Sequence, residues 1–518
     1  MYITCLLNCI FPEQITRIYI VVYLLNILSM KQVNRRDFLK STVIAGLGSS
    51  IITPDLVPKQ SHPEKQAPET NPAANPAGKK VIVAGAGIAG LCCGYELMKR
   101  GHDVTVLEGS PRHGGHILTV RDGLSDGLYA DFGAENITQP GYELFWNYAK
   151  QFNLTVLPYP KRDNILRRIK GQFYSEEMLR DPTVLKKFGF NAREITYLSE
   201  NEWPELDLLY TKPYLSKFKD EYQPFGVGYD HLDTTPIADI YRKEGASPAA
   251  LEFLGGQETS AQFELWRQAI LQMRGLPLFP KKVFRLQNGN QSLPNAFAKQ
   301  LGERVKLNSP IISIRHQPKG VTVKYLEFGK EKEITADYLA NCIPLPAFSK
   351  IPVEPALPAE KKYVLDHIAY DSYARFVFQA SSKFWLKDNL SINMDLNHPD
   401  IGGIWQVAEE VDTHRVALMG MGPGGTTPQR AIAAFREVYP GKQDTIEQAL
   451  VKDWPREQYA FTCERLNFPM GSLKKLWPHV MEPHGRIHFA GAYADNLNWG
   501  MEAATRSANR VAKEIDQA

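Results

Sequence analysis

Residues 79–116, KKVIVAGAGIAGLCCGYELMKRGHDVTVLEGSPRHGGH, decide the fold of this chain. The apolar run Val81–Ala84 is typical of a buried parallel strand. A glycine-rich turn follows it, and a helix is predicted from about Ala89 to Arg100. The run Asp103–Leu107 predicts a second strand, so the order is strand, turn, helix, strand. This order predicts an α/β domain that begins with a Rossmann-type βαβ unit.

The turn has the spacing G-x-G-x-x-G, which is typical of dinucleotide-binding sites. Gly85 permits the tight turn, Gly87 lets the backbone approach a pyrophosphate, and Gly90 lets the helix pack close to the strand. The free N–H groups and partial positive charge of the helix N-terminus favour a phosphate there. Glu108 follows the second strand, where a carboxylate can bind ribose hydroxyls. We therefore predict a dinucleotide site, the alternative being a glycine-rich turn in an unrelated α/β unit.

A second glycine pair, Gly114 and Gly115, follows Arg112 and indicates which dinucleotide is bound. A nicotinamide-binding domain does not need this pair, whereas in FAD proteins the chain passes the pyrophosphate again. In this stretch, EGSPRHGGH, the sequence resembles the flavin amine oxidase family, whose members often read E-A-R-x-R-x-G-G-R. Ser110 and His116 stand where arginines are usual in that family.

The resemblance covers about residues 80–512 and implies how the rest of the chain is organised. It implies a glutathione-reductase-like, Rossmann-type FAD-binding domain made of residues 79–140, 281–312 and 455–518. An α+β substrate-binding domain is expected in residues 141–280, which have helical periodicity, and in residues 313–454.

The C-terminal stretches Gly485–Asp495 and Asn498–Ala508 resemble the strand, loop and helix that close the family's FAD domain. That helix is expected to start near Gly500 and to face the flavin pyrimidine, where reduction builds negative charge. Ala492 stands where a glutamate is usual. The resemblance places the following residues at FAD: Gly85, Gly87, Ala89, Gly90, Glu108, Arg112, Gly114, Gly115, Ile311, Cys463, Gly491 and Met501.

The activity that the resemblance implies is oxidation of an amine to an imine, with hydride transfer to flavin N5, dioxygen as acceptor and hydrogen peroxide as product. The difficult step belongs to the cofactor, so the protein chiefly positions the substrate and excludes water. The family has a lysine near N5, ten residues before a tryptophan that matches Trp385, and this position is Arg375. Arginine keeps the charge but cannot lose it at working pH. A strand-edge arginine paired with a carboxylate such as Asp371 is the alternative.

Cys463 lies nine residues after Trp454, the spacing of the monoamine oxidase cysteine that links covalently to the flavin. The flanking glycines and tyrosine of that segment are absent here. A buried, unlinked thiol is therefore the favoured state, and a covalent link is the alternative.

The aromatic cage that encloses the amine in the family maps to Glu464 and Gly500, and neither is aromatic. Trp499 and Tyr493 are close enough to replace one wall, Trp405 is a further candidate for a wall, and Glu464 can hold a cationic group if it faces the pocket. A position in the core is the alternative for each of them. The predicted catalytic set is Arg375, Trp499 and Glu464.

Asn136 stands where amino acid oxidases place an arginine for the substrate carboxylate, which favours amines without a carboxylate. Two other functions remain open. One is a desaturase or dehydrogenase that passes electrons to an acceptor other than dioxygen. The other is a flavin-binding protein with little turnover, because the lysine and both cage positions have changed.

The composition of the 518 residues is ordinary for a globular protein. A net charge of +3 with interspersed signs favours no nucleic-acid partner, and the six cysteines show no metal-ligand spacing. The adjacent Cys92 and Cys93 are predicted to be small core residues.

The N-terminal residues 1–52 are predicted to be a targeting region rather than part of the fold. Asn34–Lys40, which contains two adjacent arginines, resembles a twin-arginine export signal, and a modestly apolar stretch follows it. This predicts a bacterial protein exported to the periplasm by the twin-arginine translocase, with an uncleaved membrane anchor as an alternative. Residues 1–29 are either an untranslated upstream extension or a short membrane segment. The proline-rich residues 53–78 are predicted to be a flexible linker.

Overall fold

The computed structural model describes residues 78–368, 370, 372–461, 468–496 and 500–518. These residues all belong to one compact unit. The predicted targeting region and nearly all of the linker lie outside the described residues, as do Cys463, Glu464 and Trp499.

A five-stranded parallel sheet carries the glycine turn, in the order β10-β2-β1-β14-β21. Its strands are β10 (Val305–Lys306), β2 (Asp103–Leu107), β1 (Lys80–Ala84), β14 (Tyr338–Asn341) and β21 (Ile487–Phe489). Helix α2 (Ile88–Lys99) connects β1 to β2, so the predicted Rossmann-type βαβ unit is confirmed. One detail differs: β14 lies in the stretch 313–454, which was assigned to the substrate-binding domain. All four of its residues are buried, and it pairs with β1 and β21 inside the dinucleotide-binding sheet.

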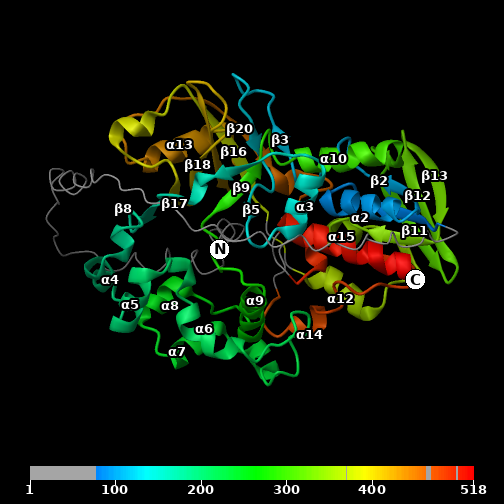
Figure 1. Ribbon diagram of the computed structural model, residues 1–518, viewed down its shortest axis with the longest axis horizontal. Coiled ribbons are helices and arrows are strands. Elements are labelled where there is room, and N and C mark those ends of the chain that lie inside the picture. Colours follow the sequence, from blue (N-terminus) through cyan, green and yellow to red (C-terminus); the bar gives the residue numbers. More distant parts are fainter. Residues whose placement is uncertain (1–77, 369, 371, 462–467, 497–499) are drawn as a thin grey trace, which may run out of the picture. The chain divides into compact units, whose positions relative to one another are not determined.

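The two faces of this sheet are covered differently because successive strand residues point to opposite sides. Val81 and Val83 of β1 share a core with α2, α10 (Ser292–Leu301), α3 (Glu143–Gln151) and α15 (Gly500–Gln517). Figure 1 shows α2 and α15 side by side, and alanines on the buried face of α15 permit this close approach. Ile82 and Ala84 belong to the core on the other face.

That other face packs against a second sheet, whose order is β13-β12-β11-β15. Its strands are β11 (Ile311–Gln317), β12 (Gly320–Glu327), β13 (Lys330–Ala336) and β15 (Val353–Glu354). A two-residue turn joins β12 to β13, and both its residues, Phe328 and Gly329, have positive φ, as a hairpin turn of this length requires.

A seven-stranded sheet forms the strand part of the region expected to bind substrate, in the order β20-β16-β19-β18-β17-β7-β8. Its strands are β20 (Ile446–Asp453), β16 (Ala374–Ala380), β19 (Val416–Gly422), β18 (Ile401–Val407), β17 (Met394–His398), β7 (Leu166–Ile169) and β8 (Gln172–Tyr174). Helix α13 (Pro428–Val438) covers one face, where Phe435 packs with Phe376 and Phe378. The opposite face holds Val377, Met419 and Trp405 in a separate core.

Helices dominate residues 182–273, as the periodicity of residues 141–280 predicted. They are α4 (Pro182–Phe188), α5 (Ala192–Glu200), α6 (Leu208–Leu215), α7 (Ile237–Lys243), α8 (Pro248–Leu254) and α9 (Ala261–Met273). Side-chain caps begin several of them, including a capping box of Asn191 and Glu194 on α5. Across the part of the chain that the structure describes, none of the helices has the length and apolarity needed to cross a bilayer.

Two small sheets join these layers near the site. One has the order β5-β9-β6, with strands β5 (Ile137–Thr138), β9 (Val283–Leu286) and β6 (Val156–Tyr159). The other pairs β3 (Thr119–Val120) with β4 (Ala130–Asp131). The buried Asn290 binds β4 and the loop after it: its backbone N–H donates to Asp131, and its Nδ2 donates to Ala134 O and Glu135 O.

Candidate active site

The first glycine turn has the conformation that its spacing predicts. Gly85 has φ +96°, and its N–H donates to Leu107 O at 2.7 Å. A Cβ on Gly90 would lie 1.9 Å from Gly85 O, so only glycine lets α2 start this close to the turn. At Gly87 a Cβ would meet nothing nearer than 3.9 Å and would point into open space. Gly85 and Gly90 are therefore required by the protein itself, whereas Gly87 leaves room for a ligand.

The second glycine pair lies directly against the first turn. Gly114 N–H donates to Ala86 O at 2.8 Å, and Gly87 and Gly114 form a parallel bridge. The Arg112 guanidinium holds this loop by donating to Gly115 O at 2.6 Å and to Ile117 O at 3.3 Å. The two glycine segments thus form one backbone surface, as expected if the chain passes a pyrophosphate twice.

Glu108 stands at the end of β2, beside these turns, and is buried. Its Oε2 accepts from Ala86 N at 2.6 Å, and its Oε1 accepts from Ser110 N at 2.9 Å. These bonds fix the carboxylate at the cavity wall, and each oxygen keeps a further lone pair for a hydroxyl. This is the position and chemistry required to bind a ribose.

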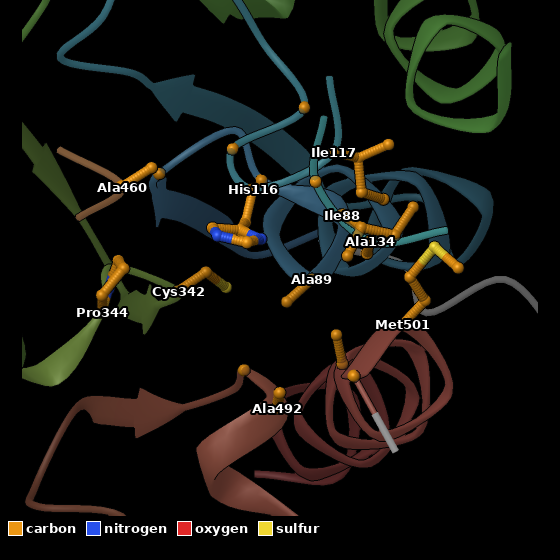
Figure 2. A pocket seen from close by; sticks show the side chains of 18 of the residues that line it. Ile88, Ala89, His116, Ile117, Ala134, Cys342, Pro344, Ala460, Ala492 and Met501 are labelled. Atoms are coloured by element: carbon orange, nitrogen blue, oxygen red, sulfur yellow. The ribbon is translucent and has the colours of Figure 1, made fainter. Parts of the chain in front are cut away.

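A cavity of about 1080 Å³ begins at these turns. It exceeds the ~300–1,000 Å³ of ordinary small-molecule sites, as expected for a dinucleotide and a substrate together. Ile88 and Ala89 at the start of α2, His116, Cys342 and Met501 are among the lining residues labelled in Figure 2. Of the predicted FAD contacts, all those described line it except Gly90, whose role is to pack α2.

The start of α15 closes the cavity from another side. Gly500, Met501 and Ala504 of its first turns line the cavity, together with Gly491 at the end of β21. Gly491 N–H donates to Ser507 Oγ at 2.9 Å, which ties this loop to the helix. Two helix N-termini, those of α2 and α15, therefore start at one cavity. Both favour negative charge, and the residues present fit an FAD.

Arg375 of β16 lines the cavity and is almost fully buried. Its NH1 donates to Glu135 Oε2 at 2.8 Å, and Glu135 Oε1 accepts from Lys161 and, at 3.2 Å, from Tyr159. The strand lies between β20 and β19, so Arg375 is not on a sheet edge, and Glu135 is the carboxylate that it binds.

Arg375, Glu135 and Lys161 shift one another's pKa values. Burial acts to lower the pKa of Arg375, but the Glu135 carboxylate outweighs it and the pKa is raised. Burial acts to raise the pKa of Glu135, but Lys161 and Arg375 outweigh it and the pKa is lowered. Lys161 is the exception: burial, aided by the Arg375 charge, lowers its pKa to about 7. The cavity wall therefore carries a permanent cation whose counter-ion is Glu135.

The sequence of this fold matches a known family over most of its length. The family described as "Flavin containing amine oxidoreductase" matches residues 88–516. The chain belongs to this family. It is an FAD-dependent oxidoreductase of the amine oxidase type. The residues of the cradle described above fit this cofactor.

Individual relatives agree with this assignment. An L-amino acid oxidase of Bothrops pictus is 25% identical over 466 residues, which are 85% of this chain and 90% of the relative. An L-amino-acid oxidase of Vipera ammodytes ammodytes is 26% identical, with 85% and 93% covered. Among solved structures, cyclohexylamine oxidase from Brevibacterium oxydans IH-35A has a TM-score of 0.68 at 20% identity, covering 85% of this chain and 99% of that one. Putrescine oxidase bound to putrescine has a TM-score of 0.69 at 17% identity, covering 85% and 100%.

The structure changes some predictions for the substrate end of this amine oxidoreductase. Tyr493 is not a cavity wall, since its side chain is buried against β14, where its OH contacts Asn341. Trp405 lies behind the wall, with the Lys161 ammonium 3.8 Å from its ring centroid. Both are candidates for aromatic walls from the sequence, but both are core residues in the structure, which is the alternative given for them. The predicted roles of Trp499 and Glu464, and the Cys463 linkage, concern residues outside those described.

Other residues at the cavity were not assigned a role from the sequence. His116, which stands at a usual arginine position, stacks on Trp454 with ring centroids 4.1 Å apart. Burial, with the charges of Arg375 and Arg112, lowers its pKa to about 3, so the imidazole is neutral. Further lining residues come from segments with no motif: Thr138, Arg162, Arg267, Phe279 and Tyr373. Only the packing of the sheets brings them to the FAD site.

Proposed function

We propose that this oxidoreductase converts a small-molecule amine to an imine, with dioxygen as the electron acceptor and hydrogen peroxide as the product. The observation that carries the proposal is the single cavity, which joins the dinucleotide cradle to a wall formed by Tyr373 and Arg375. When bound, FAD supplies the redox chemistry by accepting a hydride equivalent from the amine carbon.

The described residues have two tasks in this reaction. Ile270, Leu271 and Leu278 give the outer wall an apolar surface, which removes water from the amine. The Arg375 cation disfavours an ammonium nearby and so favours the neutral amine, the form that can be oxidised. His116, being neutral, adds no charge of its own.

The electron acceptor is tested separately because Arg375 stands where the family's lysine is usual. We propose dioxygen, and an acceptor of another class is the second candidate. The purified yellow holoenzyme is mixed anaerobically with amines and L-amino acids, and bleaching of the flavin absorbance reports the reductive step. Air is then admitted and peroxide is measured. Bleaching followed by peroxide supports the oxidase, bleaching with re-oxidation only by an artificial acceptor supports the second candidate, and no bleaching by any amine contradicts both.

We also propose that the protein is exported in folded form by a bacterial twin-arginine translocase to the periplasm. The paired Arg35 and Arg36 before a modestly apolar stretch support this. Replacing both with lysine should retain the protein in the cytoplasm, measured by fractionation. Export of that variant at the normal level would contradict the proposal.

A further inference from the structure

Arg162 is a buried cation at the cavity wall that the oxidation chemistry does not use. It ends a short 3₁₀ turn, Pro160–Arg162, directly after β6, and only 7% of the residue is exposed. Its NH1 donates to Pro280 O, and the Phe279 ring centroid lies 4.7 Å from its Cζ. Its Nε has no hydrogen-bond partner, and no carboxylate in the described ranges forms an ion pair with it.

Two of the other arginines at the cavity differ in this respect, because each is bound to a carboxylate. Arg375 is bound to Glu135, and Arg267 is bound by both Nε and NH2 to Glu264. Arg112 donates to the carbonyls of its own loop. A buried charge without a counter-ion is costly, and the cost is removed when a ligand supplies the opposite charge. Arg162 therefore has an unused donor and no carboxylate in direct contact, as expected of a residue that binds an anion.

Two more polar atoms without partners lie in the same wall. Thr138 Oγ1 and Asn136 Oδ1 are buried, neither has a hydrogen-bond partner among the described residues, and both residues line the cavity. In the three-stranded sheet, β5 and β6 flank β9, and Thr138 of β5 and Tyr159 of β6 both pair with Val283 of β9. The amide orientation of Asn136 is interchangeable, so either its oxygen or its NH₂ can face a ligand.

We infer that Arg162, with Thr138 and Asn136, binds the carboxylate of the amine substrate, so that the substrates are amino acids or other amines that carry a carboxylate. This inference rests on the proposed amine oxidase function and narrows its substrate class. The planar guanidinium fork matches a carboxylate in two parallel hydrogen bonds. Burial lowers the pKa of Arg162 to about 10, so the side chain remains charged at neutral pH.

The inference revises the expectation that Asn136 alone suggested. Asn136 stands where amino acid oxidases have an arginine that binds the substrate carboxylate. Its presence therefore predicted substrates without a carboxylate. In the folded chain a different cation, from the turn after β6, reaches the same cavity wall. The charge needed to bind a carboxylate is thus present, but it comes from another segment.

A binding experiment that needs no turnover tests this. Benzoate and its neutral analogue benzamide are titrated into the holoenzyme, and perturbation of the flavin absorbance gives each dissociation constant. The wild type should prefer benzoate. Arg162→Gln should weaken the binding of benzoate by about 10- to 100-fold, the range for a lost hydrogen bond to a charged group. The dissociation constant of benzamide should be unchanged. Arg168→Gln on β7, whose side chain does not line the cavity, is the matched control and should keep the wild-type ratio.

Turnover of matched pairs provides the second measurement. L-phenylalanine and phenethylamine differ only by the carboxylate, as do ornithine and putrescine. The wild type should have the higher kcat/KM for the amino acid of each pair, and Arg162→Gln should reverse this preference. Thr138→Val, which removes only a hydroxyl, should weaken benzoate several-fold and provides a milder test if Arg162→Gln folds poorly.

The outcomes separate the two proposals. A wild type that oxidises phenethylamine but shows no preference for benzoate over benzamide overturns the carboxylate subsite and leaves the amine oxidase function standing. A wild type whose flavin no amine or amino acid bleaches overturns the function itself. Loss of FAD from Arg162→Gln, measured by the ratio of absorbance at the flavin band to protein absorbance, would show that Arg162 serves the cofactor and would also overturn the inference.

Discussion

Replacing Glu135 with glutamine should destabilise the protein strongly, because this carboxylate is the counter-ion of two buried cations. Glu135 Oε2 lies 2.8 Å from Arg375 NH1, and its Oε1 contacts Lys161. No more than about 6% of any of the three residues is exposed. Glutamine has almost the same shape, so the substitution removes charge without leaving a cavity.

The magnitude follows from burial. Breaking a buried ion pair by removing one partner costs about 3–5 kcal/mol, because the remaining charge is left without compensation. For a chain of this length, inverse scaling with size gives about 1–2 °C of Tm per kcal/mol, so Tm should fall by roughly 3–10 °C.

The loss should also depend on pH, through Lys161. Its pKa is already lowered to about 7 by burial and should fall further without Glu135. Below pH 7 the folded wild type binds a proton on Lys161, whereas the folded Glu135→Gln variant leaves this lysine neutral. The free energy of unfolding of the wild type should therefore exceed that of the variant by a growing amount as the pH falls from about 9 to about 6.

Thermal unfolding at saturating FAD, with the same cofactor concentration throughout, measures these shifts. Glu354→Gln is the control, since its partner Arg315 lies 3.6 Å away in an exposed pair, and such pairs contribute about 0–1 kcal/mol. Adding Lys161→Met to Glu135→Gln should restore part of the loss. A Glu135→Gln shift within about 1 °C of the control at pH 6 would refute the role given to this buried carboxylate.

Three further predictions concern the cofactor site and its helices. Gly87→Ala should fold with near wild-type stability but retain little FAD, because its Cβ enters the cavity. Gly90→Ala should lose both stability and FAD, because its Cβ would lie 1.9 Å from Gly85 O. FAD absorbance and the Tm of the apoprotein distinguish the two variants, and equal behaviour would contradict the assignment. Glu502 accepts hydrogen bonds from the α3 backbone, and burial raises its pKa from 4.5 to about 7. The wild type should therefore lose stability relative to Glu502→Gln as the pH rises from about 4.5 to 7. Parallel profiles of Tm against pH for the two proteins would show that Glu502 does not titrate in this way. Acid precipitation of the holoenzyme should give a colourless pellet and a yellow supernatant, while a yellow pellet would establish a covalent flavin, for example through Cys463.

Local sequence predicted the cofactor half of the site well. The glycine spacing places three residues within one turn, and each has a task that depends on near neighbours: positive φ at Gly85, space at Gly87 and close packing at Gly90. The same holds for Glu108, which follows its strand directly. Such features are visible in a sequence because the contacts that require them are short-range or made by backbone.

Two candidates for the substrate half, Tyr493 and Trp405, differ from the structure for the opposite reason. Tyr493 and Trp405 have the right chemistry for cavity walls, but whether an aromatic ring faces a cavity or a neighbouring sheet depends on the layer packed against it. The Glu135–Arg375 pair joins residues from β16 and the loop after β4, far apart in the chain. Nothing in either segment alone identifies the other.

The sequence by itself therefore determined that the chain folds into a Rossmann-type α/β domain with a dinucleotide site, because strand, turn and helix periodicity and backbone geometry are encoded locally. The second glycine pair and the resemblance to the flavin amine oxidase family identified the dinucleotide as FAD. Only the tertiary structure decided which charged side chains share the cavity wall. Arg162 reaches it through the register of β5, β9 and β6, and Arg375 reaches it from the interior of a seven-stranded sheet. The free energy of these charges depends on burial and on partners from distant segments, and both exist only once the layers have packed.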